Sequence, residues 1–300
     1  MRRIPLLGIM LMLASLGLAQ TTPHKLRPEH DLNNYGVVET IPGMDKVVPR
    51  QLTWKTVSGV ALLMDVYAPP GTKGAVPAVV FVNGVGMWPG GTPLRTWGQY
   101  TSWPRLIAAS GMVAITFDAR GEASNADDVR DVFAYVRDHA KDLGVDPTRV
   151  AAWACSANVR SALAVLMAPE APPVVTAVLY YGSAEVPSFR RDLPVQFVRA
   201  GRDRPQMNEL NDRMTAAALA ANAPWTLVNV PQGHHAFDVL DDTEESRQAV
   251  RGTVAYLRDR LFPAPTPTQP KSEALEALSH FMPGEWAEAE DAYTRWLGKH

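Results

Sequence analysis

Short, fully apolar runs recur along the middle of the chain, and longer amphipathic stretches separate them. Strands that are covered on both faces have continuous apolar runs of this kind, so each run predicts a buried strand of a parallel sheet. Before these runs, two alternating segments joined by Ser58 and Gly59 predict an antiparallel pair. The eight predicted strands are residues 50–57, 61–67, 78–82, 113–117, 150–154, 177–181, 195–199 and 225–230.

The amphipathic stretches repeat apolar residues at three- and four-residue spacing, which is typical of helices with one buried face. Residues 127–143 predict one such helix, which Gly144 ends, and residues 158–167 and 243–262 predict two more. Strands that alternate with helices predict an α/β fold: a mainly parallel, eight-stranded sheet with helices on both faces. In such sheets ligands bind beyond the carboxyl ends of the strands.

A stretch rich in tryptophan, glycine and proline follows the strand at 78–82. Trp88, Trp97 and Trp103 predict a loop of about twenty residues, and loops of that length in compact domains are usually functional. We expect this loop to cover the pocket in part and to give it an aromatic wall. The alternative is that these rings pack into the core.

Length and charge narrow the class of protein. The chain has 300 residues, 46% apolar and 20% charged, which is enough to bury a full core. Its net charge of −2 provides no basic surface for nucleic acid. The single cysteine, Cys155, excludes an intramolecular disulfide.

The first residues have the pattern of a signal peptide. A basic start precedes an apolar run from Ile4 to Leu18, and Ala19 stands before a suitable cleavage point. We therefore predict a signal peptide over 1–19, export to the periplasm or the exterior, and no membrane span after cleavage. An uncleaved anchor is the alternative, although the run is shorter than the ~20 residues that span a bilayer. Residues 20–49 are an N-terminal extension before the domain at 50–262.

The C-terminal region differs from the rest in composition. Residues 263–272 are rich in proline and predict a semi-rigid linker. Residues 273–300 predict two helices broken at Pro283 and Gly284, and they resemble a single tetratricopeptide unit. One such unit cannot bury its own apolar face. The tail is therefore expected to dock a protein partner or to pack on the catalytic domain.

Three polar residues follow three of the predicted strands. Ser156 lies between the strand at 150–154 and a helix, Asp203 follows the strand at 195–199, and His235 follows the strand at 225–230. A serine, an acid and a histidine in this order, each past a strand end, is the chain order of the α/β-hydrolase triad.

Residues 50–262 resemble the α/β-hydrolase family, and the dienelactone hydrolases in particular. The resemblance is carried by "VDPTRVAAWACSANVRSALAVL" around the serine, "AGRDRP" around the acid and "GHHAF" around the histidine. It implies that Ser156 is the nucleophile, that His235 is its base and that Asp203 orients the base. His234 is the alternative base, but in the family the histidine stands directly before a small residue and a phenylalanine, as His235 does.

The resemblance also implies an oxyanion hole. One backbone N–H donor is that of Ala157, after the nucleophile, and the second is that of Val85, with Gly84 as the alternative. The competing interpretation of Asn83 and Gly84 is a simple turn.

The corner around the serine departs from the family pattern Gly-x-Ser-x-Gly. Ala154 and Asn158 replace the glycines. The Asn158 side chain either caps the new helix or competes with the oxyanion for the same N–H donors. Cys155 precedes the nucleophile position, and we interpret it as a small buried thiol rather than as the nucleophile that dienelactone hydrolases use.

Asp118 and Arg120 match a loop beside such active sites, with a solvated ion pair as the alternative. No metal site or cofactor is expected, because His-Glu-x-x-His and Gly-x-Gly-x-x-Gly patterns are absent from the sequence. Between Gly182 and Pro194 there is no room for a large lid.

The sequence thus predicts an exported serine hydrolase that acts on a small-molecule ester or lactone, with short acyl groups favoured over long-chain lipids. Two other classes compete with it. A prolyl-oligopeptidase-type peptidase would carry a propeller, for which the residues before 50 leave no room. An inactive hydrolase fold with a docking tail would be a binding module.

Overall fold

The computed structural model describes residues 25–83, 92–121, 125–262 and 294–295. Its centre is an eight-stranded sheet in the order β2-β3-β5-β4-β6-β7-β8-β9, in which β2, β3 and β5 pair antiparallel and all other pairs are parallel. The strands are β2 (Arg50–Val57), β3 (Val60–Tyr67), β4 (Val76–Phe81), β5 (Val113–Phe117), β6 (Val145–Cys155), β7 (Thr176–Tyr180), β8 (Val195–Ala200) and β9 (Trp225–Val230). All eight predicted strands are confirmed.

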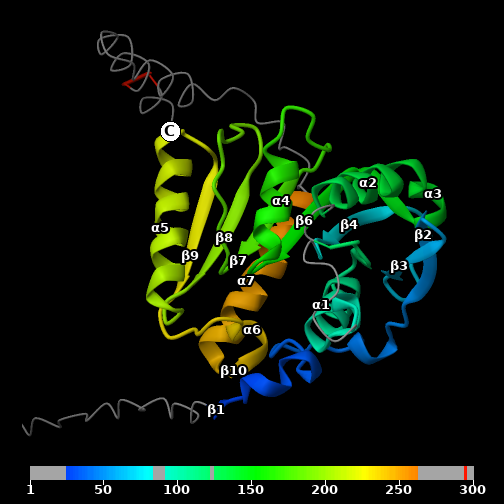
Figure 1. Cartoon of the computed structure of the whole chain (residues 1–300), viewed down its shortest axis with the longest axis horizontal. Helices are drawn as coiled ribbons and strands as arrows, with labels where there is room; N and C mark the ends of the chain where they lie inside the picture. Colours follow the sequence, from blue (N-terminus) through cyan, green and yellow to red (C-terminus); the bar gives the residue numbers. More distant parts are fainter. Residues whose placement is uncertain (1–24, 84–91, 122–124, 263–293, 296–300) are drawn as a thin grey trace, which may run out of the picture.

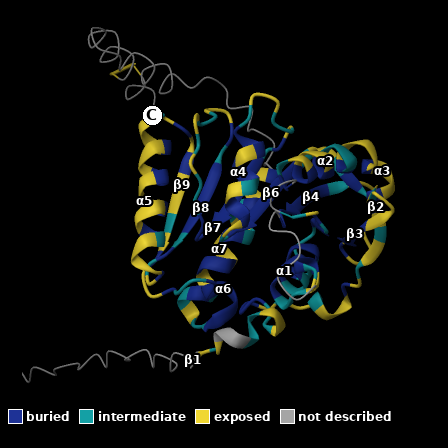
Figure 2. Ribbon diagram, in the orientation of Figure 1, coloured by how far each residue is buried: buried dark blue, intermediate teal, exposed yellow. Residues whose placement is uncertain are grey.

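Helices cover both faces of the sheet (Figure 1). One face carries α1 (Gly98–Ala109), α6 (Phe237–Leu240) and α7 (Glu244–Leu261). The other carries α2 (Asn125–Asp138), α3 (Ala140–Leu143), α4 (Asn158–Leu166) and α5 (Pro205–Ala220). Two hydrophobic cores result; the central strands between them are buried, whereas the edge strands β2 and β9 have many exposed positions (Figure 2).

Strand β4 and the residue after it contribute side chains to both cores. Val79 and Phe81 belong to the core under α1 and α7, whereas Ala78, Val80 and Val82 belong to the core under α2 and α4. Because side chains alternate between the faces of a strand, a strand that is covered on both sides must be apolar at every position.

The predicted helix at 127–143 is two helices. His139 leaves helical geometry at φ −110° and ψ 18°, which separates α2 from α3. Gly144 ends α3 at φ 70°, a left-handed conformation that glycine adopts without strain. The helices predicted at 158–167 and 243–262 are present as α4 and α7, the latter capped by the Thr243 hydroxyl.

The prediction of a long tryptophan-bearing loop after β4 is wrong in part. Residues 94–96 form the 3-10 helix η3 (Leu94–Thr96), and α1 follows at once. Trp103 is fully buried in the core, so for this ring the alternative of core packing holds. Trp97 is half-buried, and Trp88 lies outside the described residues.

The N-terminal extension is packed on the domain as far as it is described. Strand β1 (Lys25–Leu26) pairs with β10 (Asp241–Asp242), and the 3-10 helices η1 (Glu29–Asn34) and η2 (Met44–Lys46) follow it. Val37, Val38 and Val47 are buried in the core beside α1.

The predicted signal peptide at 1–19 and the linker at 263–272 lie outside the described residues, as does the helical tail at 273–300 except Thr294 and Arg295. In the part of the chain that is described, no helix combines the length and the apolar character that crossing a bilayer demands.

Candidate active site

The three predicted triad residues meet at the carboxyl edge of the sheet. Ser156 follows β6, Asp203 follows β8 and His235 follows β9. The Ser156 Oγ atom lies 2.8 Å from His235 Nε2, and His235 Nδ1 lies 2.7 Å from Asp203 Oδ2. These distances make one continuous chain of hydrogen bonds from the serine hydroxyl to the carboxylate.

Ser156 stands on a sharp corner between β6 and α4. Its φ of 52° is in the left-handed region, which is strained for a residue with a side chain. The corner is held where the Ser156 N–H donates to the Tyr180 carbonyl at 2.9 Å, which continues the pairing of β6 with β7. Since α4 begins two residues later, the serine projects beyond the sheet at the start of a helix.

The acid and the base differ in exposure. The Asp203 side chain is fully buried, and its second oxygen accepts the Arg204 N–H at 2.7 Å. The His235 side chain is 26% exposed, which leaves it reachable from solvent. A buried carboxylate that accepts a hydrogen bond from Nδ1–H fixes the ring orientation and presents Nε2 to the serine.

His234, the alternative base, is occupied elsewhere. Its Nδ1 lies 3.0 Å from Asp241 Oδ2, and its backbone N–H donates to the same oxygen at 2.8 Å. The histidine that contacts Ser156 is therefore His235.

The Asn158 side chain contacts helix α1. It is buried, and its Nδ2 donates to the Tyr100 hydroxyl at 2.6 Å. Neither expectation for this residue, helix capping or competition with the oxyanion, describes this contact. Asn158 instead joins the nucleophile corner to α1.

Cys155 is also buried and lies 3.3 Å from the Tyr100 hydroxyl. Burial raises the pKa of its thiol to about 12, so the thiolate is scarce at neutral pH.

One of the two predicted oxyanion donors can be placed. Ala157 is exposed and directly precedes α4, where first-turn N–H groups have no acceptor within the helix. Val85 and its alternative Gly84 lie outside the described residues. Asn83, just before them, is buried and donates through Nδ2 to the Phe117 carbonyl at 3.1 Å, which ties the end of β4 to β5.

Asp118 and Arg120 do not pair with each other. Asp118 Oδ1 lies 2.8 Å from Arg95 Nε, and Arg120 binds Asp128. Arg95 is 7% exposed and also contacts Asp65 at 2.7 Å. It is thus the centre of a buried ion cluster beside the carboxyl edge, and no sequence motif marks it.

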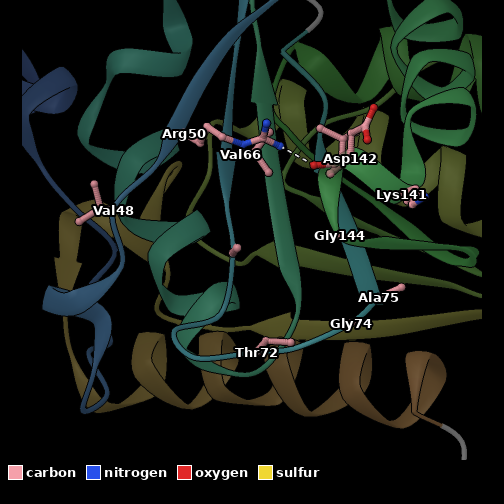
Figure 3. Close-up of a pocket in the computed structure, with 11 residues that line it drawn as sticks. Val48, Arg50, Val66, Thr72, Gly74, Ala75, Lys141, Asp142 and Gly144 are labelled. Atoms are coloured by element: carbon pink, nitrogen blue, oxygen red, sulfur yellow. Dashed lines mark hydrogen bonds between the residues drawn. The ribbon is translucent and has the colours of Figure 1, made fainter.

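Two of the surface cavities lie at opposite edges of the sheet. A groove of about 730 Å³ runs between α4 and α5, lined by Ser183, Phe189, Arg160 and Arg213 among others. Ser183 follows Gly182, which packs against Ser156, but none of the triad residues lines the groove. The cavity of Figure 3, about 560 Å³, includes Ala75 and Gly144, which precede β4 and β6, and so lies at the opposite, amino edge.

No group of three or more histidine, cysteine, aspartate or glutamate side chains is arranged to hold a metal ion within residues 25–83, 92–121, 125–262 and 294–295.

Comparison with known proteins identifies the fold. Residues 64–172 match the model of BD-FAE, a family of the α/β-hydrolase type. No curated protein matches the sequence significantly.

Solved structures of esterase 2 from the planctomycete Thermogutta terrifontis are similar to the chain. The propionate-bound form has a TM-score of 0.60 at 21% identity, over 75% of this chain and 98% of that one. The butyrate-bound form has a TM-score of 0.59 at 20% identity over the same shares. The form phosphorylated by paraoxon has a TM-score of 0.59 at 21% identity, over 75% of this chain and 97% of that one. The chain therefore has the α/β-hydrolase fold, shared with esterases.

Proposed function

We propose that the protein is an exported serine hydrolase that cleaves a small carboxylic ester or lactone through Ser156, His235 and Asp203. The observation that carries the proposal is the unbroken pair of hydrogen bonds, 2.8 Å from Ser156 to His235 and 2.7 Å from His235 to Asp203. A serine hydroxyl is a weak nucleophile until an adjacent base accepts its proton, and this arrangement supplies such a base.

In the first half-reaction, Ser156 Oγ attacks the ester carbonyl carbon and its proton passes to His235 Nε2. Asp203 stabilises the resulting imidazolium through Nδ1 without taking the proton. The carbonyl oxygen becomes an oxyanion, which accepts a hydrogen bond from the N–H of Ala157 at the start of α4 and, as the family resemblance implies, a second one from the N–H of Val85. When the tetrahedral intermediate collapses, the C–O bond to the alcohol breaks and His235 protonates the leaving oxygen.

In the second half-reaction, water attacks the acyl-enzyme. His235 takes a proton from the water and returns it to Ser156 Oγ as the acid leaves. A lactone follows the same steps, except that its alcohol remains part of the acyl group, so hydrolysis of the acyl-enzyme releases a single hydroxy acid.

Two observations support a small substrate. The connection from β7 to β8, residues 181–194, contains no helix and no inserted lid. The esterase with the similar fold has been observed with propionate and with butyrate, both short acyl groups. We therefore favour short acyl chains over long ones.

Labelling with a fluorophosphonate probe tests the nucleophile. We expect the purified protein to be labelled at Ser156, and labelling to disappear in Ser156→Ala and remain in Ser161→Ala, a matched change in α4. We also expect faster hydrolysis of p-nitrophenyl butyrate than of the palmitate ester. Absence of labelling in folded protein would favour a non-enzymatic binding module, and faster palmitate hydrolysis would refute the small-substrate assignment.

Cell fractionation tests export. Expression of the full chain should place the protein outside the cytoplasm, with a mass that matches an N-terminus at Gln20. A cytoplasmic protein that retains residues 1–19 would refute this part of the proposal alone.

A further inference from the structure

We propose that Asp238 is a positioning residue that holds the His235 loop and the Tyr181 ring in place for catalysis. The inference rests on the proposed function, and it concerns a carboxylate that does not belong to the triad.

Asp238 is a fully buried carboxylate whose partners are neutral. Its Oδ2 accepts hydrogen bonds from Gln99 Nε2 at 2.8 Å and Trp103 Nε1 at 2.7 Å, and its Oδ1 accepts one from Tyr181 Oη at 2.6 Å. Within the described part of the chain, no arginine, lysine or histidine forms an ion pair with it. Burial raises its pKa, because the charged form has lost its contact with water.

Such an arrangement is costly for stability. A buried charge without a counter-ion is unfavourable unless its hydrogen bonds are complete, and a well-packed apolar group in the same space is often at least as stabilising. The three donors converge from α1 and the end of β7 onto α6. They therefore fix the relative positions of segments that the triad requires.

The first connection from Asp238 to the base is through the chain. Asp238 is three residues beyond His235, and the intervening Ala236 has φ 61°, a left-handed conformation that turns the chain into α6. The Asp238 carbonyl also accepts the Val38 N–H at 2.8 Å. Anchoring Asp238 in the core thus anchors the C-terminal end of the short loop that carries the base.

The second connection is through Tyr181. Its ring lies 4.8 Å from the His235 ring, centroid to centroid, at an interplanar angle of 58°. Its hydroxyl points the other way, to Asp238. Asp238 therefore sets the position of the aromatic face against which the imidazole rests.

The same cluster reaches the nucleophile corner. Gln99 Oε1 accepts a weak hydrogen bond from Cys155 Sγ at 3.7 Å, and the neighbouring Tyr100 bonds Asn158. Residues on both sides of Ser156 and the residue that anchors His235 thus share one buried network through α1. Displacing a catalytic group by about 1 Å costs on the order of a hundredfold in rate, so this network bears directly on kcat.

Three variants test the role. Asp238→Asn keeps the shape but turns one acceptor into a donor. Tyr181→Phe keeps the ring beside His235 and removes its bond to Asp238. The matched control is Tyr180→Phe, the same change at the adjacent, equally buried tyrosine, whose hydroxyl bonds Thr253 on α7 at 2.7 Å instead.

We expect kcat on a butyrate ester to fall on the order of tenfold or more in Asp238→Asn and severalfold in Tyr181→Phe, with KM within about twofold. Tyr180→Phe should lose comparable stability in urea but keep its kcat. Equal kcat in the two tyrosine variants, or an unchanged kcat in folded Asp238→Asn, would overturn the positioning role. If Asp238→Asn does not fold, the comparison of kcat between Tyr181→Phe and Tyr180→Phe still tests the positioning role. Wild-type hydrolysis and Ser156 labelling are measured in parallel, so a failure of the proposed function is recognised separately.

Discussion

Gly182 is the residue whose replacement most directly tests the geometry of the nucleophile corner. It follows β7 by two positions and lies against the backbone of the corner. A Cβ atom at this position would be 2.1 Å from the Ser156 carbonyl oxygen and 2.7 Å from a methyl group of Val159. Gly182→Ala therefore introduces a steric conflict with the nucleophile residue itself.

The size of the effect follows from these distances. Cβ atoms are essentially never found closer than 3.0 Å to such neighbours, so the end of β7 and the corner must separate by about 1 Å. Overpacking of this kind costs about 1–3 kcal/mol in the free energy of unfolding. A shift of about 1 Å at Ser156 should lower kcat on the order of a hundredfold.

Gly252→Ala is the matched control. Gly252 lies in α7, and a Cβ there would meet nothing within 4 Å. Replacing glycine by alanine inside a helix stabilises by roughly 0.5–1 kcal/mol, so this variant should be slightly more stable and fully active.

Urea denaturation gives the stability of each variant, and the rate of fluorophosphonate labelling per folded molecule gives the reactivity of Ser156. A Gly182→Ala variant that labels at the wild-type rate would refute the claim that this contact positions the nucleophile.

Three further predictions concern the surroundings of the site. Asn158→Gly restores one family glycine but removes the hydrogen bond from Asn158 to the buried Tyr100 hydroxyl. The free energy of unfolding in urea should therefore fall by about 1–3 kcal/mol, and kcat/KM should not rise; a more active variant would contradict this. Burial by itself would raise the pKa of Asp128, but hydrogen bonds from Arg120 and Lys55 lower it below 3.8, so its contribution to stability is present above about pH 4 and lost below it. Between about pH 6 and pH 3, the urea unfolding midpoint of Asp128→Asn should therefore fall less than that of the wild type. An equal fall in both proteins would argue against this role of Asp128. Because the pKa of Cys155 is raised to about 12, folded protein should resist iodoacetamide at about pH 8, where roughly one thiol in ten thousand is ionised, and react once unfolded; rapid labelling of folded protein would exclude a buried thiol.

The parts of the fold that the sequence predicts are those with a local signal. Strands β4 to β9 are mostly apolar, and β2 and β3 alternate around the turn at Ser58 and Gly59, so all eight were found; α4 and α7 have regular apolar spacing. Helix α1 was missed because Pro104 lies inside it and glycine and tryptophan surround its start. Helix α5 was missed because many of its positions are alanine, which gives only a weak apolar stripe, although Pro205 at its first turn is a start signal.

In the candidate site, too, some residues have a local sequence signal and others do not. Ser156, Asp203 and His235 were predicted because each follows a strand end in the order that the triad requires. Asp238 and Arg95 have no such signal, because their partners are distant in sequence: Trp103 and Gln99 are 135 and 139 residues before Asp238, and Asp65 is 30 residues before Arg95. Contacts of this kind depend on how α1 and η3 are placed against the sheet, which no local pattern encodes.

The absence of both family glycines at the corner has a structural explanation in the neighbouring strand. Glycines in Gly-x-Ser-x-Gly relieve crowding where strand and helix meet. Here Ala154 is fully buried in the core under α2 and α4, and the Asn158 side chain is used for a bond to Tyr100. A close backbone approach is found at Gly182, just past β7, where a Cβ atom would lie 2.1 Å from the Ser156 carbonyl oxygen. A small residue is thus required at the position that faces Ser156, whose φ is 52° and whose Oγ lies 2.8 Å from His235 Nε2.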